Sequence, residues 1–277
     1  MKNIQTLSIP INFGQKKPGV SEGSNILYDS YFRKKFNTME NINYKHKKFI
    51  HKGIDNERTL FMLQKQINEE KEKIDFSIFL GGDHSMSMGT ISGQFINYDK
   101  EKCVIWLDAH TDCNNIKFSK TGNIHGMPVS ALLGDLEEPF INYKCLKYND
   151  ICYIGTRSID PYEKEYIKEK KILNMGIKEV NEDLDNVLDR LDKFINGREV
   201  HISFDIDIMD PEFISSTGTL EKNGVNMEQM EKILLFLTKY NVISMDIVEF
   251  NPELGDLEKT KKNLFILLDI FFNNLFS

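Results

Sequence analysis

Cysteine is scarce in this sequence. Its 277 residues include four cysteines, Cys103, Cys113, Cys145 and Cys152, and no two of them form a C-x-x-C pair. This excludes a small scaffold held together by disulfides, and so few thiols indicate the reducing cytoplasm. Cys113 lies inside a polar motif described below, but no motif around it supports a nucleophilic thiol. We interpret it as a bystander.

Long apolar runs and an excess of positive charge are also missing. No apolar run approaches the roughly 20 residues that span a bilayer, and residues 1–10 lack the basic start and continuous apolar stretch of a signal peptide. The formal net charge is −7, whereas nucleic-acid binders usually carry a concentrated basic surface. The densest basic run, Lys45 to Lys52, is followed closely by acidic residues, and we interpret it as a solvated surface. We expect neither a membrane nor a nucleic acid as partner.

The composition that remains is that of an ordinary globular protein, with 40% apolar and 28% charged residues. We find no repeat, linker or low-complexity tract, which predicts one domain over residues 1–277. Strands are predicted at Gln5–Ile11, Phe76–Leu80, Val104–Leu107, Ile151–Ile154, Val200–Phe204 and Val242–Val248. Helices are predicted at Asn25–Lys35, Asn56–Glu70, Ser85–Phe95, Pro128–Leu133, Tyr162–Lys170, Asn186–Ile195, Met227–Lys239 and Leu257–Asn274. Strands that alternate with helices predict an α/β fold with a mostly parallel sheet covered on both faces.

Polar clusters follow directly after four of the predicted strands. The clusters are Gly81–His84, Asp108–Asp112, Asp205–Asp207 and Glu249. Sites of open α/β sheets form at the carboxyl ends of the strands, and parallel strands place all these ends at one edge. We therefore expect the four segments to meet there.

The spacing of the acidic residues predicts a metal site. Asp108, His110 and Asp112 lie at i, i+2 and i+4, so they point to one side if the chain stays extended past the strand. Asp205 and Asp207 repeat the pattern. Buried carboxylates this close need compensating positive charge, which two divalent cations would supply. The candidate ligands are His84, Asp108, His110, Asp112, Asp205 and Asp207.

The ligand types indicate which metal to expect. Carboxylates and imidazoles without a thiolate suit a harder ion than a structural zinc. Manganese is our first choice, although cobalt, iron, nickel or zinc could occupy the site in vitro. The competing interpretation is a set of solvated strand ends and ordinary His–Asp pairs. Three such clusters at one sheet edge argue against it.

Taken together, five segments resemble the signature of the ureohydrolase superfamily and, within it, of the arginase family. They are GGDHS (81–85), DAHTD (108–112), GNIHGMPVS (122–130), SFDIDIMDP (203–211) and EFNP (249–252). The resemblance implies a three-layer α-β-α fold, two Mn²⁺ per subunit and a cytoplasmic homo-oligomer, trimer or hexamer, of arginine metabolism and the urea cycle. It implies that His84 and Asp112 bind one ion, that His110 and Asp207 bind the other, and that Asp108 and Asp205 bridge both.

The resemblance also implies a substrate pocket. The implied contacts to the substrate's α-carboxylate are Asn114, Thr121 and Asn123; those to its α-amino group are Asp160 and Glu163; and Thr219 is a pocket hydroxyl. An alternative for Asp160 and Glu163 is an acidic pair favoured by the dipole at a helix N-terminus. Three positions depart from the family pattern, which has Ser at Thr121, Pro at Leu220 and Gly at Asn223.

The implied reaction converts L-arginine and water to L-ornithine and urea. Asp112 would move a proton from the attacking water to the departing amine. Glu249 would pair with the guanidinium, and His125 would exchange protons with solvent. His201 and Asp210 would be structural.

Other functions stay open at this point. The main alternative is agmatinase or another hydrolase of guanidino compounds. A deacetylase on the related fold usually uses one zinc ion and lacks the full ligand set. A non-catalytic binding protein would have lost ligands, and none is lost here.

Overall fold

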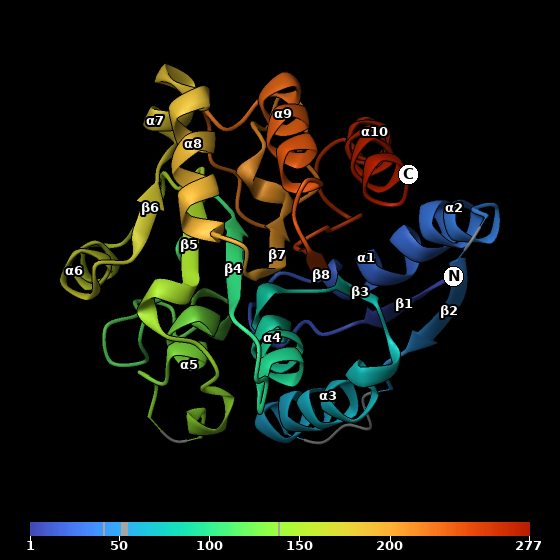
Figure 1. The fold of residues 1–277 in the computed structure, drawn as a ribbon. Helices are drawn as coiled ribbons and strands as arrows, with labels where there is room; N and C mark the ends of the chain where they lie inside the picture. The colour runs from blue at the N-terminus through green and yellow to red at the C-terminus, as the bar shows by residue number, and fades with distance from the viewer. Residues whose placement is uncertain (41, 51–54, 138) are drawn as a thin grey trace.

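The computed structural model describes residues 1–40, 42–50, 55–137 and 139–277 (Figure 1). Its described strands form one sheet of eight strands in the order β2-β1-β3-β8-β7-β4-β5-β6, and every pair is parallel. The strands are β1 (Lys2–Ile9), β2 (Ile42–Lys48), β3 (Phe76–Gly81), β4 (Lys102–Leu107), β5 (Ile151–Ile154), β6 (Leu173–Met175), β7 (Glu199–Asp205) and β8 (Val242–Val248).

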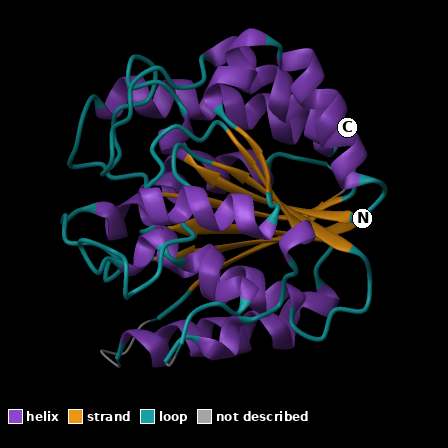
Figure 2. Cartoon of the chain, turned by 90° about the vertical axis from the view of Figure 1, so that its left-hand side faces the viewer, coloured by secondary structure: helices purple, strands orange, loops and turns teal. Residues whose placement is uncertain are grey.

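Helices cover both faces of this sheet (Figure 2). They are α1 (Val20–Leu27), α2 (Arg33–Asn37), α3 (Asn56–Glu70), α4 (Ser87–Phe95), α5 (Pro128–Leu133), α6 (Pro161–Lys170), α7 (Ile177–Glu182), α8 (Leu184–Ile195), α9 (Met227–Leu237) and α10 (Leu257–Leu275). Helices α8, α9 and α10 lie on one side, and α3, α4 and α5 on the other (Figure 1). The predicted α/β class, with three α-β-α layers, is confirmed.

The alternation of side chains along each strand explains why both layers are needed. In β3, Ile78 belongs to the core under α8, α9 and α10, whereas its neighbour Phe79 packs in the core under α3. In β4, Ile105 and Trp106 divide between the two faces in the same way. A strand buried on both faces needs a continuous apolar run, which is the pattern that the sequence has at these strands.

Two strands and one helix were not predicted from the sequence. The edge strand β2 contains the lysines of the basic run, and Lys47 pairs with Glu70 at 2.6 Å. The end of that run, Lys52, lies outside the described residues. Strand β6 has only three residues, and the short helix α7 follows it. An edge strand exposed to solvent needs no apolar alternation, which explains why β2 looked like a solvated surface.

Two predicted elements also had wrong boundaries. Strand β1 begins at Lys2 and ends at Ile9, because Pro10 lacks the N–H that would continue the ladder. The first helical segment begins at Val20, five residues earlier than predicted, and a π-helical turn over Tyr28–Phe32 joins α1 to α2.

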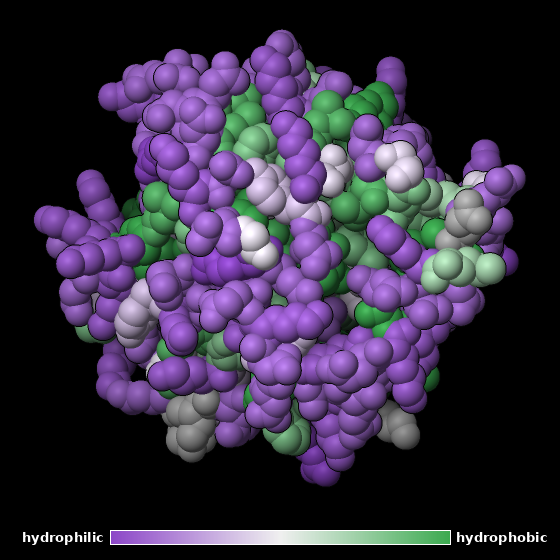
Figure 3. Space-filling view, in the orientation of Figure 1, coloured by the Kyte–Doolittle hydropathy of each residue, from purple (hydrophilic) through white to green (hydrophobic). Residues whose placement is uncertain are grey.

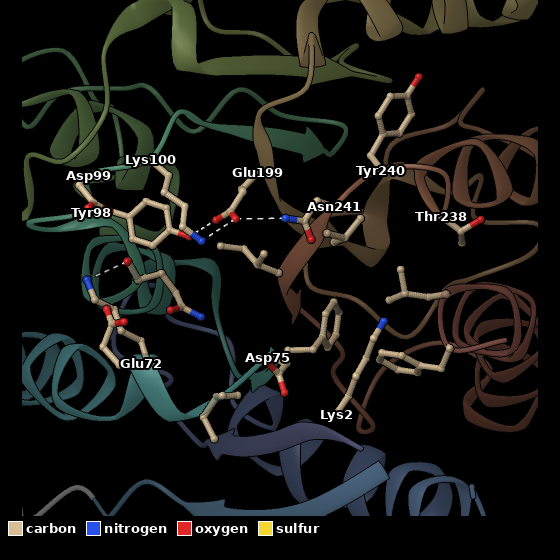
Figure 4. Close-up of a pocket in the computed structure, with 18 of the residues that line it drawn as sticks. Lys2, Glu72, Asp75, Tyr98, Asp99, Lys100, Glu199, Thr238, Tyr240 and Asn241 are labelled. Carbon is tan, nitrogen blue, oxygen red and sulfur yellow. Dashed lines mark hydrogen bonds and ion pairs between the residues drawn. The ribbon is translucent and has the colours of Figure 1, made fainter. Parts of the chain in front are cut away.

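The molecule has a polar surface and a cavity at the amino edge of the sheet. Figure 3 shows one largely hydrophilic face, and no helix among the described residues is long and apolar enough to cross a membrane. A cavity of about 750 Å³ opens at the amino edge of the sheet (Figure 4). Within it, Glu199 pairs with Lys100 and also accepts hydrogen bonds from Tyr98 and Asn241.

Candidate active site

The predicted polar clusters meet at the carboxyl edge of four adjacent strands. In the sheet, β3, β8, β7 and β4 are consecutive neighbours. His84 follows β3, Glu249 follows β8, Asp205 ends β7 and Asp108 follows β4. Distant parts of the chain therefore contribute to one buried cluster, as parallel topology requires.

The chain turns at this edge instead of continuing as extended strands, so the extended geometry predicted for Asp108–Asp112 is wrong. Asp112 has a φ of 46° and Glu249 a φ of 62°, a left-handed conformation that costs energy for residues with a side chain. Asp108 Oδ1 accepts the N–H of His110 at 2.7 Å, and Asp205 Oδ1 accepts the N–H of Asp207 at 2.8 Å. These tight turns bring the side chains together.

Three carboxylate oxygens surround Nδ1 of His84. Asp108 Oδ2 and Asp205 Oδ2 lie 3.2 Å away, and Asp112 Oδ2 lies 2.9 Å away. His84 is buried, with 1% of its surface exposed. Its Nδ1 makes no hydrogen bond to any of the three oxygens. A buried nitrogen that faces carboxylate oxygens without hydrogen-bond geometry fits a ligand that shares a cation with them.

A second group of ligand atoms adjoins the first. His110 Nδ1 lies 3.1 Å from Asp207 Oδ2 and 3.4 Å from Asp108 Oδ1. Asp108 belongs to both groups that could hold an ion, whereas Asp205 belongs to the His84 group alone. The geometry therefore supports Asp108 as a bridge more directly than it supports Asp205.

Neighbouring side chains fix the orientation of the ligands. The ring of Trp106 stacks on that of His84, with centroids 4.3 Å apart, and its Nε1 donates to Asp108 Oδ2 at 3.0 Å. Ser203 Oγ lies 2.8 Å from Nε2 of His84. Because Nε2 is engaged in this way, Nδ1 is the nitrogen directed at the carboxylates, and such supporting contacts are typical of metal sites.

Burial makes negative charge costly at this site. Burial, together with the neighbouring charge of Asp108, raises the pKa of Asp112 to about 6. Burial and Asp207 raise the pKa of Asp205 well above its usual value. Burial opposes the charged imidazoles, yet the carboxylates raise the pKa of both His84 and His110 well above the ordinary range. Each of these shifts favours the protonated form, because added positive charge stabilises the cluster of carboxylates. Divalent cations would supply that charge in place of protons.

A cavity of about 290 Å³ opens above these ligands. All predicted catalytic and substrate-binding residues line it: Asp112, Asn114, Thr121, Asn123, His125, Asp160, Glu163, Thr219 and Glu249. Their roles in catalysis and binding stay predictions. The geometry establishes that they share one cavity with His84, His110 and Asp205.

The acidic side of this cavity is held by backbone contacts. Glu163 accepts the N–H of Asp160 at 3.0 Å and that of Cys113 at 3.2 Å. Asn114 donates to Asp160 Oδ2 at 3.1 Å. Burial raises the pKa of Glu163 to about 7. Glu163 therefore has both positions that the sequence allowed: it caps the N-terminus of α6, and it lines the cavity.

Glu249 and His125 form a second polar group in the cavity. Glu249 Oε1 accepts the N–H of His84 at 2.9 Å and lies 3.0 Å from Nδ1 of His125. Burial opposes protonation of His125, but the hydrogen bond to Glu249 raises its pKa to about 9. Below them, burial and then the charge of Glu249 raise the pKa of Asp83 to about 6.

Comparison with known proteins accounts for this arrangement. A model of the arginase family matches residues 2–268, nearly the whole chain. This chain belongs to the arginase family. It is 33% identical to the arginase of Entamoeba histolytica, with 98% of each chain covered. It is 32% identical to arginase-1 of Bos taurus, over 92% of this chain and 86% of the bovine one.

A solved arginase structure has the same fold. The crystal structure of the Entamoeba histolytica arginase in complex with L-ornithine matches with a TM-score of 0.90, at 30% identity and with 98% of each chain covered. The resemblance noted in the sequence is confirmed, and membership in the arginase family makes the chain a metal-dependent hydrolase of the ureohydrolase type.

The loop that departs from the arginase pattern is nevertheless well anchored. Leu220 is 51% exposed, so it faces solvent, while Thr219 Oγ1 donates to Asp207 Oδ2 at 3.0 Å. Asn223 has a φ of 60°, a conformation that Asn adopts more readily than most residues with a side chain. Asp210 Oδ2 accepts the N–H of Gly224 at 3.0 Å. Asp210 therefore has the structural role predicted for it.

His201 also has a structural environment. Its Nδ1 lies 2.8 Å from Ser244 Oγ and its Nε2 lies 3.6 Å from Asp246 Oδ2. His201 is fully buried on β7, where it pairs in register with Ser244 of β8. It is outside the residues that line the active-site cavity.

Sequence reasoning missed several residues of this arginase-family site. Ser119, Lys120 and Ser158 line the cavity, whereas Asp83, Trp106 and Ser203 support its ligands or its floor. Asp83 and Ser203 stand inside the quoted motifs, so a signal was present. Trp106 looked like an ordinary apolar strand residue, because its indole N–H has no signature in a sequence pattern.

Proposed function

We propose that this chain converts L-arginine and water to L-ornithine and urea, in one domain spanning residues 1–277. The observation that carries the proposal is a single cavity that joins a carboxylate-rich metal-ligand cluster to polar groups suited to an α-amino acid. The related arginase crystallised with L-ornithine supports this choice of substrate and product.

Two Mn²⁺ ions fit the residues present. His84 and Asp112 would hold one ion, His110 and Asp207 the other, with Asp108 and Asp205 between them. When bound, the ions supply the positive charge that these carboxylates demand, and they make water available as hydroxide near neutral pH. The buried, unpartnered Nδ1 of His84 supports this assignment.

Glu249 orients the guanidinium of the substrate. Its Oε1 is held by the N–H of His84 and by His125. Its Oε2 lies close to Gly218: a Cβ added to that glycine would be 3.7 Å from this oxygen. A planar cation and a fixed carboxylate oxygen make a directional, charge-assisted contact. Asn114, Thr121, Asn123, Asp160, Glu163 and Thr219 bind and position the rest of the substrate.

Asp112 and His125 carry out the proton transfers. Hydrolysis needs a base to take a proton from the attacking water and an acid to deliver one to the departing amine nitrogen. The Asp112 carboxylate lines the cavity beside His84, with its Oδ2 2.9 Å from Nδ1 of that residue, and from this position it takes the first proton and delivers the second. His125 is part-buried at the cavity wall and exchanges protons between the site and solvent.

The proposal extends to the setting of the enzyme. We place it in the cytoplasm, in arginine metabolism and the urea cycle, as a homo-oligomer of three or six subunits. The four cysteines support a reducing compartment, since none of them forms a disulfide. No nucleic acid or membrane partner is proposed.

A substrate panel tests the function. Urea release is measured from L-arginine, agmatine and 4-guanidinobutyrate with Mn²⁺ present. The proposal predicts that kcat/KM for L-arginine exceeds that for the other two by a large factor, because agmatine lacks the α-carboxylate, and 4-guanidinobutyrate lacks the α-amino group and is one methylene shorter. A preference for agmatine would replace the proposal with an agmatinase.

A further inference from the structure

A lysine without an assigned role, Lys120, lies at the mouth of the active-site cavity. Lys120 belongs to the loop over residues 115–123 and lines the cavity beside Ser119, Thr121 and Asn123. Among the described residues that line the cavity, it is the one Lys or Arg. Its Nζ lies 3.9 Å from Asp160 Oδ1. A positive and a negative group thus stand side by side at the entrance.

The loop that carries Lys120 is fixed to the body of the protein. Phe118 stacks on Tyr162 of α6, with ring centroids 4.3 Å apart and planes 14° from parallel. Ser119 Oγ accepts the N–H of Gly122 at 3.1 Å, which closes a turn around Lys120. The backbone of Lys120 is therefore held at the entrance, while its side chain, 80% exposed, stays able to reorient.

Asp160 is oriented toward Lys120. Asn114 holds its Oδ2 at 3.1 Å, which leaves Oδ1 on the side of Lys120. The separation of 3.9 Å is too long for a hydrogen bond. Both groups therefore keep the capacity to bind a ligand that enters between them.

Electrostatics explain why a cation is needed at this position. The wall and floor of the cavity carry Asp112, Asp160, Glu163, Asp205 and Glu249. Two divalent cations would offset the four metal-binding carboxylates and a protonated His125 would offset Glu249, but Asp160 and Glu163 would remain. An anionic substrate group that enters this cavity meets repulsion unless a positive group receives it.

We infer that Lys120 binds the α-carboxylate of the substrate through its Nζ, next to Asp160, the residue already proposed to contact the α-ammonium group. The inference rests on the proposed function and adds a charged specificity residue to its neutral contacts. Lys120 and Asp160 together match the two opposite charges of an amino acid head. Because Lys120 is exposed, it attracts the anion without holding the product in a buried ion pair.

The test compares two lysines of the same loop. Lys117 is an exposed lysine that pairs with Glu137 and lies outside the residues lining the cavity. The variants are Lys120→Met, Lys120→Arg and, as matched control, Lys117→Met. Each is assayed with Mn²⁺ for kcat/KM on L-arginine and for inhibition by L-ornithine and by 1,4-diaminobutane, which lacks the carboxylate.

Lys120→Met is expected to lower kcat/KM for L-arginine and to weaken L-ornithine inhibition by roughly three- to fivefold each. Inhibition by 1,4-diaminobutane is expected to change less than about twofold. Lys120→Arg and Lys117→Met are expected to resemble the parent. Equal weakening of both inhibitors, or no weakening of either, overturns the role of Lys120. A parent protein that releases no urea from L-arginine refutes the proposed function instead.

Discussion

Asp108 is the carboxylate common to both groups of candidate metal ligands. Its Oδ2 faces His84 and its Oδ1 faces His110, and it is fully buried. Its replacement therefore affects both ions, whereas replacement of His84 affects one. The Asn variant preserves the shape of the side chain and an acceptor for Trp106, which separates loss of charge from loss of packing.

We predict that Asp108→Asn loses both metal ions, whereas His84→Asn keeps the ion held by His110 and Asp207. Metal content per chain, measured by elemental analysis after dialysis, gives the answer. The reverse order, with both ions retained in Asp108→Asn and none in His84→Asn, would refute Asp108 as the bridge.

The contact between Glu249 and His125 predicts a pH dependence. Because this contact raises the pKa of His125 to about 9, its proton stabilises the folded state fully below the unfolded value of about 6.5. That contribution is lost as the pH rises through about 9.

In the metal-free protein, Glu249→Gln should shift the titration midpoint of His125 from about 9 down toward 6.5, as followed by NMR of the imidazole. His46 of β2, which lies outside the residues that line the cavity, serves as the internal reference. An unchanged midpoint for His125 would mean that Glu249 does not set its protonation.

At the scale of elements, the loop over residues 219–225 depends on one glycine. A Cβ on Gly224 would lie 2.6 Å from Arg157 Nη2 and 2.6 Å from the backbone nitrogen of Asp210. Since backbone cannot yield as a flexible side chain does, Gly224→Ala should cost about 2 kcal/mol of stability. In a chain of this size the midpoint of thermal unfolding should fall by about 4–8 °C.

Asn223→Gly is the matched control, because glycine adopts the left-handed conformation of residue 223 without strain. We expect its unfolding midpoint to stay within about 2 °C of the parent. Calorimetry of both variants decides. If Gly224→Ala unfolds at the parent temperature, the loop relaxes more freely than its contacts suggest.

Elements with a strong periodic signal could be predicted from the sequence. The central strands β3, β4, β7 and β8 are buried on both faces, so their apolar runs are long and unambiguous. The two strands at the edges of the sheet could not be predicted, because β2 is half solvated and β6 is three residues long. Their existence depends on pairing with a neighbour, which is a property of the tertiary structure.

The same distinction holds within the site. That the candidate ligands lie together could be predicted, because they directly follow strong strands. The conformation that joins them could not, since the positive φ of Asp112 and of Glu249 is imposed by the surrounding packing. Lys120 escaped notice because a lysine in a polar loop is usually a solvated charge. Its place at the cavity mouth appears only when α6 and the loop are packed together.

At the scale of the whole molecule, the site exists only when most of the chain is folded. Its candidate metal ligands run from His84 to Asp207, and Glu249 follows β8. Four adjacent strands must pair in the right order before these groups meet. Metal binding and folding should therefore be coupled, because the unfolded chain offers no preformed site.

The most direct test of the account is the rate of urea release from L-arginine during titration of metal-stripped protein with Mn²⁺. The account predicts no urea from the stripped protein, and a rate that rises until two equivalents of Mn²⁺ per chain are bound and then stays constant. Magnesium should restore less activity than manganese, because nitrogen ligands suit it poorly. Full activity in protein verified to be metal-free, or saturation at one equivalent, would contradict a two-metal hydrolase.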